Sequence, residues 1–177
     1  KRVDTCERDI ACLLSGGLDS SIISAFVCKM YREKTGRILE TYSIGLQDAE
    51  DLSYAKQVSE HIKSKHKQVI MTNEQFIDSI PHVIKDIESY DTTSVRASVG
   101  NWNIGKYISK NSEAKVIFNG DGSDELAGGY LYFHSCPTNE EFHNETQRLL
   151  KDIHHFDVLR SDKSISSHGL ETRTPFL

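Results

Sequence analysis

Short apolar runs alternate along this chain with longer segments whose apolar residues recur at helical spacing. Residues 11–14 read Ala-Cys-Leu-Leu and are followed by Ser-Gly-Gly, the pattern of a buried strand that ends at glycines. Similar runs predict further strands at residues 39–44, 68–71 and 116–118. Helical spacing predicts helices at residues 20–34, 51–63, 73–90, 97–110 and 139–159 and around 163–168. Pro81 is expected to start, kink or interrupt the helix around it.

Strands that alternate with helices indicate an α/β protein with a parallel sheet, helices on both of its faces and a helical C-terminal part. In such sheets, ligands bind beyond the carboxyl ends of the strands. Two glycine-containing loops, residues 15–21 and 119–125, follow the first and fourth predicted strands. We therefore expect both loops to open onto the same edge of the sheet.

The first loop reads Ser-Gly-Gly-Leu-Asp-Ser-Ser. Its glycines permit close approach of a ligand to the backbone, its serines add hydroxyl donors, and the helix that follows offers free N–H groups. These features together predict a cradle for phosphate or pyrophosphate. Asp19 would repel a phosphate unless it holds Mg²⁺, and it could instead cap the helix. The loop matches neither the Walker pattern, whose lysine is missing, nor the dinucleotide fingerprint.

The second loop reads Asn-Gly-Asp-Gly-Ser-Asp-Glu. Its three carboxylates, Asp121, Asp124 and Glu125, would repel one another unless cations or hydrogen-bond donors meet them. A magnesium ion shared with phosphate oxygens is the natural partner for them. The alternative is a solvated acidic turn without a ligand.

Composition narrows the class of protein further. Of the 177 residues, 37% are hydrophobic and 27% are charged, which is typical of one soluble globular domain. The net charge of −5 and a pI near 5.9 argue against a general nucleic-acid binder. No apolar stretch is long enough to span a membrane, and four cysteines without zinc spacing fit reduced cytosolic thiols. We therefore predict a cytoplasmic protein that binds neither nucleic acid nor membrane.

Five sequence blocks, in order along nearly the whole chain, carry a resemblance to a known family. They are residues 13–21 (LLSGGLDSS), 89–98 (SYDTTSVRAS), 122–125 (GSDE), 128–134 (GGYLYFH) and 169–177 (GLETRTPFL). The first block resembles the pyrophosphate loop of the ATP pyrophosphatase (N-type) family, whose members cleave ATP to AMP and pyrophosphate. All five together resemble the synthetase domain of the asparagine synthetase B family. The resemblance implies the ATP pyrophosphatase (adenine nucleotide alpha hydrolase-like) fold.

The resemblance also implies an activity, that of a glutamine-hydrolysing asparagine synthetase. Such a ligase uses ATP and Mg²⁺ to convert L-aspartate to β-aspartyl-AMP, releases pyrophosphate, and then displaces AMP with ammonia derived from glutamine. Residues 1–177 would form its ATP-binding domain, truncated at both ends. An N-terminal glutaminase domain and a C-terminal segment that bears a lysine would be missing, and a homodimer is left open.

Candidate site residues follow from the resemblance, position by position. Positions that match nucleotide and pyrophosphate contacts are Leu13, Ser15, Gly16, Gly17, Ser20, Ile44, Asn119 and Gly120. Asp19 and Asp124 match carboxylates that bind magnesium. Asp121 matches a carboxylate needed for adenylation, which is Glu in the closest relatives, and the family often has Ser where Asn119 stands.

Charged residues in two other blocks are candidates for catalysis and substrate binding. Arg96, expected in a loop, could bind pyrophosphate or the substrate carboxylate in bidentate fashion, or could form a surface salt bridge. Asp157, Arg160, Glu171 and Arg173 could orient aspartate, which offers an ammonium and two carboxylates, or could form a structural ion-pair network.

Two rival functions remain open at this point. One is another adenylating ligase of the same fold, such as a β-lactam, GMP or argininosuccinate synthetase. Residues 90–93 and 129–134 favour asparagine synthetase over these. The other is a nucleotide-binding regulatory module without catalysis, against which the retained Asp19, Asp124 and Arg96 argue.

Overall fold

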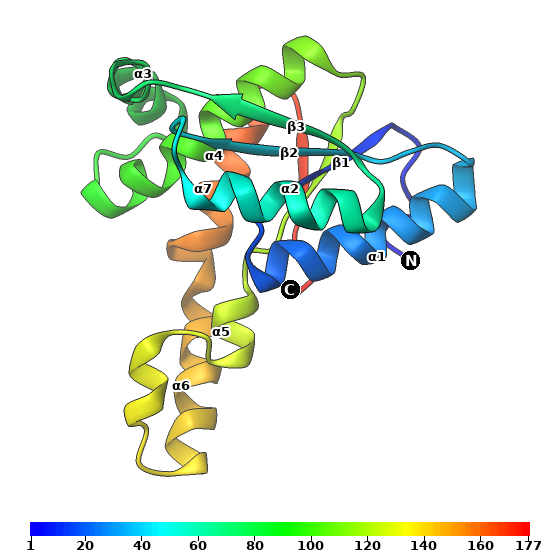
Figure 1. The fold of residues 1–177 in the computed structure, drawn as a ribbon. Coiled ribbons are helices and arrows are strands. Elements are labelled where there is room, and N and C mark those ends of the chain that lie inside the picture. Colours follow the sequence, from blue (N-terminus) through cyan, green and yellow to red (C-terminus); the bar gives the residue numbers. More distant parts are fainter.

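Five parallel strands form one sheet in the computed structural model of this chain, in the order β3-β2-β1-β4-β5 (Figure 1). The structure describes residues 1–156 and 160–177 in full and only the helical backbone of residues 157–159. The strands are β1 (Ile10–Leu13), β2 (Glu40–Gly45), β3 (Lys65–Ile70), β4 (Val116–Phe118) and β5 (Glu171–Arg173). The predicted parallel α/β sheet is thereby confirmed.

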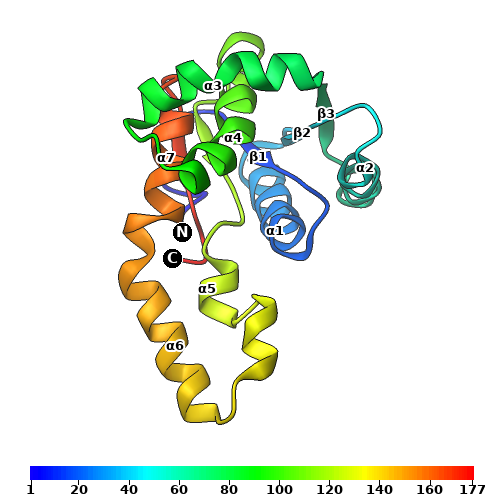
Figure 2. The same ribbon diagram turned by 90° about the vertical axis from the view of Figure 1, so that its left-hand side faces the viewer.

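Helices cover both faces of this sheet. They are α1 (Leu18–Thr35), α2 (Glu50–Ile62), α3 (Asn73–Ile87), α4 (Thr92–Asn111), α5 (Ser123–Ala127), α6 (Asn139–Asp152) and α7 (Asp157–Ser166), with short 3₁₀ helices η1 (Leu131–Ser135) and η2 (Ile153–His155). Figure 2 shows α1 and α2 on one side of the strands and α3, α4 and α7 on the other. Within the described residues, no helix combines the length and apolar character needed to cross a membrane.

The central strand β1 divides the core into two layers, because successive side chains of a strand point to opposite faces. Ile10 and Cys12 pack with Val27 of α1 on one face. Ala11, on the other face, packs with Ile104 of α4 and Ile165 of α7. Both layers remove apolar surface from water, so both stabilise the position of β1 at the centre of the sheet.

The strand register places the two glycine-containing loops side by side. β1 and β4 are hydrogen-bonded neighbours, and Cys12 lies opposite Phe118, the last residue of β4. Residues 14 and 119 therefore leave the sheet from adjacent strands at nearly the same level. The parallel pairing brings the two loops to one edge, as the sequence pattern predicts.

A helical extension projects from the sheet layers in both views (Figures 1 and 2), where α5 and α6 lie side by side. The rings of Phe133 and Phe142 pack there with centroids 4.7 Å apart. Gly128 adopts a positive φ of 68° beside Phe142 and ends α5. This extension accounts for the predicted helical C-terminal part.

Several predicted element boundaries are wrong, each for a local reason. The helix expected at residues 139–159 is divided, because Phe156 leaves helical dihedral angles (φ −129°, ψ −65°) and the chain turns into α7. The helix expected from residue 97 already begins at Thr92, because the Asp91 carboxylate accepts a hydrogen bond from Ser94 N at 2.8 Å and caps it. Strand β5 was not predicted, since Glu-Thr-Arg has no apolar alternation.

Pro81 lies inside α3 without ending that helix. Its ring is on the exposed face of the helix, where carbonyls can tilt toward water. On the opposite face, Val83 and Ile87 pack against α4 through Val99 and Trp102. The packing of this buried face holds the helix together across the proline.

Candidate active site

The two glycine-containing loops touch at the carboxyl edge of the sheet. A Cβ added to Gly120 would lie 2.8 Å from Ser20 N and 3.0 Å from Asp19 C. Ser123 Oγ donates a hydrogen bond to Asp19 Oδ1 at 2.6 Å. Asp19 is thus held by a residue 104 positions away in sequence, and the absence of a side chain at position 120 is what lets the loops approach.

The first loop is built from backbone turns and serine hydroxyls. Ser15 Oγ and Ser20 Oγ lie 2.9 Å apart, and Gly17 N donates to Ser15 Oγ at 3.3 Å. Gly16 has a φ of 88°, and a Cβ there would lie 2.5 Å from both Tyr54 Cβ and Ala55 N. This loop therefore requires glycine at position 16 for its backbone conformation and for its contact with α2.

Helix α1 points its N-terminus into this region. Its N-cap residue, Gly17, supplies no side-chain hydrogen bond to the first turn. The first N–H groups of an 18-residue helix, with the positive end of its dipole, therefore face the loop cavity. Such an end favours a phosphate or another anion.

The second loop leaves β4 and turns at Gly122, whose φ is 88°. Asn119 Nδ2 donates to Asp121 Oδ2 at 2.9 Å, and Ser161 Oγ of α7 donates to the same oxygen. Glu125 is buried and accepts a hydrogen bond from Tyr130 OH. Asp121 and Glu125 are thus met by donors from the loop itself, from α7 and from the segment after α5.

A cavity of about 340 Å³ lies between the loops. It is lined by Leu13, Ser15, Gly17, Asp19, Ser20, Asn101, Asn119, Gly120, Asp121, Gly122, Ser123, Asp124, Glu125 and Arg160. Four carboxylic acids and one guanidinium share this wall, so a polyphosphate would meet strong repulsion there without a cation.

Magnesium fits the chemistry of this wall. Asp19 and Asp124 would offer hard oxygen ligands, and Mg²⁺ in proteins is usually bound by one or two carboxylates together with water and substrate phosphates. Among the described residues, no group of three or more His, Cys, Asp or Glu side chains is arranged to hold a metal ion by itself. A metal here would therefore depend on ligand oxygens for the rest of its coordination.

A second cavity, of about 140 Å³, adjoins the first and shares Leu13, Ser15 and Asn101 with it. Its lining is Leu13, Leu14, Ser15, Tyr42, Ser43, Ile44, Asp51, Leu52, Asn101 and Ile104. Apolar side chains of β1, β2 and α4 form much of this wall. This smaller cavity is thus more apolar than the cavity between the loops.

The structure does not bring every predicted residue to this place. Arg96 is exposed on α4, in the helix and not in the expected loop, and it lines a separate apolar cavity of about 640 Å³ beside α3. Glu171 and Arg173 pair with each other on the edge strand β5, and neither lines the polar cavity. Arg173 Nη1 donates to Arg2 O at 2.6 Å. The side chain of Asp157 lies outside the described residues.

Three polar residues of the site were not predicted from the sequence. Asn101, Ser123 and Ser161 each contact a loop residue or line the cavity. Ser123 belongs to a block that the family resemblance already marks, so a signal was present. Asn101 and Ser161 sit within helical patterns without any motif, and only the packing of α4 and α7 reveals them.

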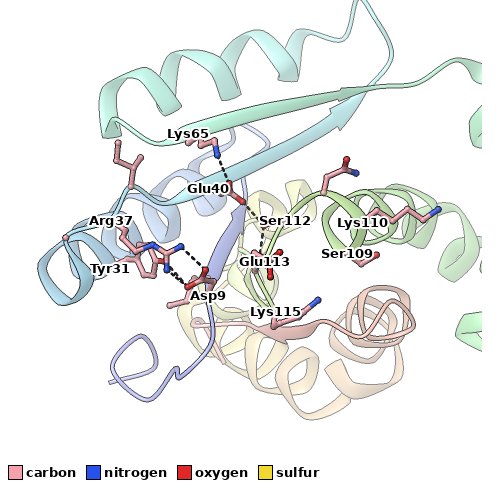
Figure 3. A pocket seen from close by; sticks show the side chains of 15 residues that line it. Asp9, Tyr31, Arg37, Glu40, Lys65, Ser109, Lys110, Ser112, Glu113 and Lys115 are labelled. Atoms are coloured by element: carbon pink, nitrogen blue, oxygen red, sulfur yellow. Dashed lines mark hydrogen bonds and ion pairs between the residues drawn. The ribbon is translucent and has the colours of Figure 1, made fainter.

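A larger cavity, of about 840 Å³, lies at the opposite, amino edge of the sheet (Figure 3). Four of its charged groups form two ion pairs: Arg37 pairs with Asp9 at 2.5 Å, and Lys65 pairs with Glu40 at 3.0 Å. Burial raises the Glu40 pKa, but hydrogen bonds from Ser112, Lys65 and Tyr42 outweigh it and lower that pKa to about 2. This pattern is that of a structural ion-pair network.

The parallel sheet and its two touching loops define an α/β protein whose polar ligand cavity lies at the carboxyl edge of the strands. The family model of asparagine synthase matches residues 2–142 and 135–177. The chain therefore belongs to the asparagine synthase family.

Curated relatives are similar to this chain over all or nearly all of its length. Asparagine synthetase [glutamine-hydrolyzing] of Homo sapiens is 48% identical over 178 residues, which cover 100% of this chain and 32% of that protein. The Rattus norvegicus protein of the same name is 49% identical with the same coverage, and that of Gallus gallus is 48% identical over 96% of this chain and 30% of its own. The chain thus spans about a third of the length of these relatives. Among solved structures, NMN synthetase from Francisella tularensis is similar over 97% of this chain and 74% of its own, with 13% identity and a TM-score of 0.46, too low to add to the assignment.

Proposed function

We propose that this chain is the ATP-binding part of a glutamine-dependent asparagine synthetase, which adenylates the β-carboxylate of aspartate and transfers the aspartyl group to ammonia. The observation that carries the proposal is the contact between a phosphate-type loop and an acidic loop at one cavity, in a chain of the asparagine synthase family. Ammonia would come from glutamine, hydrolysed by another domain of the full-length protein in the cytoplasm.

The chemistry explains why such a cavity needs both loops. A carboxylate is a poor acceptor for ammonia, whereas a mixed anhydride with AMP offers a good leaving group. To form it, the β-carboxylate must approach the α-phosphate of ATP, and both are anions. Bound Mg²⁺, held by Asp19 and Asp124, would neutralise phosphate charge. The backbone N–H groups at the start of α1 offset more of the repulsion.

The remaining lining residues have matching roles in this proposal. Ser15 and Ser20 would donate to pyrophosphate oxygens, and Leu13 and Ile44 would hold the adenosine in the smaller cavity. Arg160 would supply positive charge for a substrate carboxylate.

Three candidate side chains keep a less direct connection with the cavity. Arg96 keeps only an indirect connection, because its side chain lines another cavity while Asn101 of the same helix lines the polar one. Glu171 and Arg173 remain candidates for aspartate only through β5, whose Arg173 carbonyl accepts a hydrogen bond from Asn119 N at 3.2 Å.

Aspartate-dependent release of pyrophosphate from ATP and Mg²⁺ by the full-length protein tests the proposal. Asp19→Ala should lower this rate by about two orders of magnitude or more. The magnesium ion would lose a carboxylate ligand, so the phosphate charge would be neutralised less well. Asp48→Ala is the matched control: Asp48 is exposed in the turn before α2 and lines neither the polar cavity nor the smaller cavity beside it, so its loss should leave the rate unchanged.

Two results would contradict the proposal. If wild-type protein binds ATP but releases no pyrophosphate with aspartate, the chain is a nucleotide-binding module. If Asp19→Ala releases pyrophosphate as fast as wild type, Asp19 has no part in holding the metal. Circular dichroism spectra of both variants show whether the fold is retained.

A further inference from the structure

Two donors from different elements bind one oxygen of Asp121. Asn119 Nδ2, at the end of β4, donates to Asp121 Oδ2 at 2.9 Å. Ser161 Oγ, on α7, donates to the same atom. The backbone N–H of Asp121 also donates to Asn119 Oδ1, at 3.4 Å, so Asn119 contacts Asp121 through both ends of its amide. A carboxylate held in this way has little freedom to rotate.

Ser161 is itself held in place from a third element. Ser161 is only 1% exposed, and Asn101 Nδ2 of α4 lies 3.2 Å from Ser161 Oγ. Because Asn101 donates to this hydroxyl, the hydroxyl hydrogen of Ser161 is directed toward Asp121. Asn101 and Asp121 both line the polar cavity, whereas Ser161 lies behind it.

We infer that Asn119 and Ser161 are positioning residues that aim the Asp121 carboxylate into the polar cavity, with Asn101 orienting the Ser161 hydroxyl. The inference rests on the proposed function, because it concerns the reaction that Asp121 would serve. The side chain of Asp121 is short, and the two donors fix the position of its carboxylate group. A longer side chain would carry the carboxylate into the space of the Ser161 hydroxyl.

Steady-state pyrophosphate release by the full-length protein, with ATP and aspartate varied separately, tests this role. Ser161→Ala should lower kcat by about tenfold, the effect of losing one hydrogen bond that holds a reacting group, while the KM for ATP stays within about twofold of wild type. Ser164→Ala is the matched control. Ser164 is a buried serine on the same helix, and its hydroxyl donates to the Ser161 carbonyl at 3.1 Å. Its loss should affect stability and leave kcat unchanged.

A second variant separates positioning from simple packing. Asp121→Glu should lower kcat, since the extra methylene pushes the carboxylate against Ser161. In this background, Ser161→Ala should raise kcat, because removing the hydroxyl makes room for the longer side chain. The sign of the Ser161→Ala effect would thus reverse between the two backgrounds, which additive, independent effects cannot produce.

The outcomes distinguish this inference from the proposed function. If wild-type protein shows no aspartate-dependent pyrophosphate release, the proposed function fails and the inference fails with it. If wild type is active but Ser161→Ala has an unchanged kcat, or lowers kcat equally in both backgrounds, the positioning role alone is overturned. Equal losses in Ser161→Ala and Ser164→Ala would also overturn it, since they would indicate a general effect on packing.

Discussion

At the scale of single residues, the two loops show which information is local in the sequence and which is not. Glycines in residues 15–21 indicate a tight turn by their own identity, so the turn from strand to helix could be predicted from this segment alone. Arg173 could not be placed in this way. Its guanidinium contacts Arg2 O and Thr5 Oγ1, which lie 171 and 168 positions away. No local sequence pattern predicts these two contacts. Asp121 is a similar case, because one of its donors comes from α7.

Gly16 offers a test at this scale, with Gly36 as its control. Both have a positive φ, 88° and 69°, but a Cβ at position 36 would meet nothing within 4 Å. Gly36→Ala should therefore cost only backbone strain, about 1–2 kcal/mol of unfolding free energy. Gly16→Ala should cost about 1–3 kcal/mol more, since its Cβ would overlap Tyr54 and Ala55 of α2. Urea unfolding followed by circular dichroism measures both, and equal losses would show that the contact with α2 is unimportant.

At the scale of elements, long apolar patterns predicted helices and central strands well, and their ends poorly. The start of α4 depends on one hydrogen bond from Ser94 N to the Asp91 carboxylate. A single capping residue is a weaker signal in a sequence than the repeated spacing of apolar residues. Strand β5 exists because it pairs with β4, with Val116 opposite Glu171, and not because of its own composition. Edge strands of this kind are defined by their neighbour in the sheet.

The N-terminus of α3 gives a test of such an end. Thr72 and Gln75 form a capping box: Gln75 N donates to Thr72 Oγ1 at 3.3 Å, and Thr72 N donates to Gln75 Oε1 at 2.9 Å. Thr72→Ala should lower the free energy of unfolding by about 1 kcal/mol. Asn73→Ala, an exposed neighbour inside the first turn, should change it by less than about 0.5 kcal/mol. The same loss in both variants, measured by thermal unfolding, would indicate that the cap contributes nothing.

At the scale of the whole molecule, the two edges of the sheet carry cavities with different arrangements of charged groups. The carboxyl edge carries the loop cavity, which four carboxylic acids and Arg160 line. The amino edge carries the larger cavity, where Arg37 pairs with Asp9 and Lys65 pairs with Glu40 (Figure 3). Cavity volume alone therefore favours the edge where ion pairs gather over the edge where the two loops meet. Because parallel strands share one direction, stabilising contacts can gather at one edge while the other stays available for ligands.

Glu40 connects three segments at the amino edge. Lys65 Nζ of β3 donates to its Oε1 at 3.0 Å, and Ser112 Oγ, after α4, donates to its Oε2 at 2.6 Å. Tyr42 OH donates to Oε2 as well, at 2.8 Å. Although burial raises the Glu40 pKa, these donors lower it from an ordinary 4.5 to about 2. A carboxyl whose pKa is lower in the folded state stabilises the fold above its ordinary pKa, and this contribution is lost as the pH falls through about 2.

Glu40→Gln should therefore destabilise the protein in a way that depends on pH. Between pH 7 and pH 5 its unfolding free energy should lie below that of wild type by a constant amount, on the order of 2 kcal/mol for a charge-assisted set of hydrogen bonds. Below pH 4.5 the difference should shrink toward zero, because the wild-type carboxylate becomes protonated on unfolding. Glu113→Gln, an exposed acid on the rim of the same cavity, should match wild type closely across this range. Urea unfolding of wild type and variants at a series of pH values measures these free energies. If the difference between wild type and Glu40→Gln stays constant down to pH 3, Glu40 acts through packing and not through its charge.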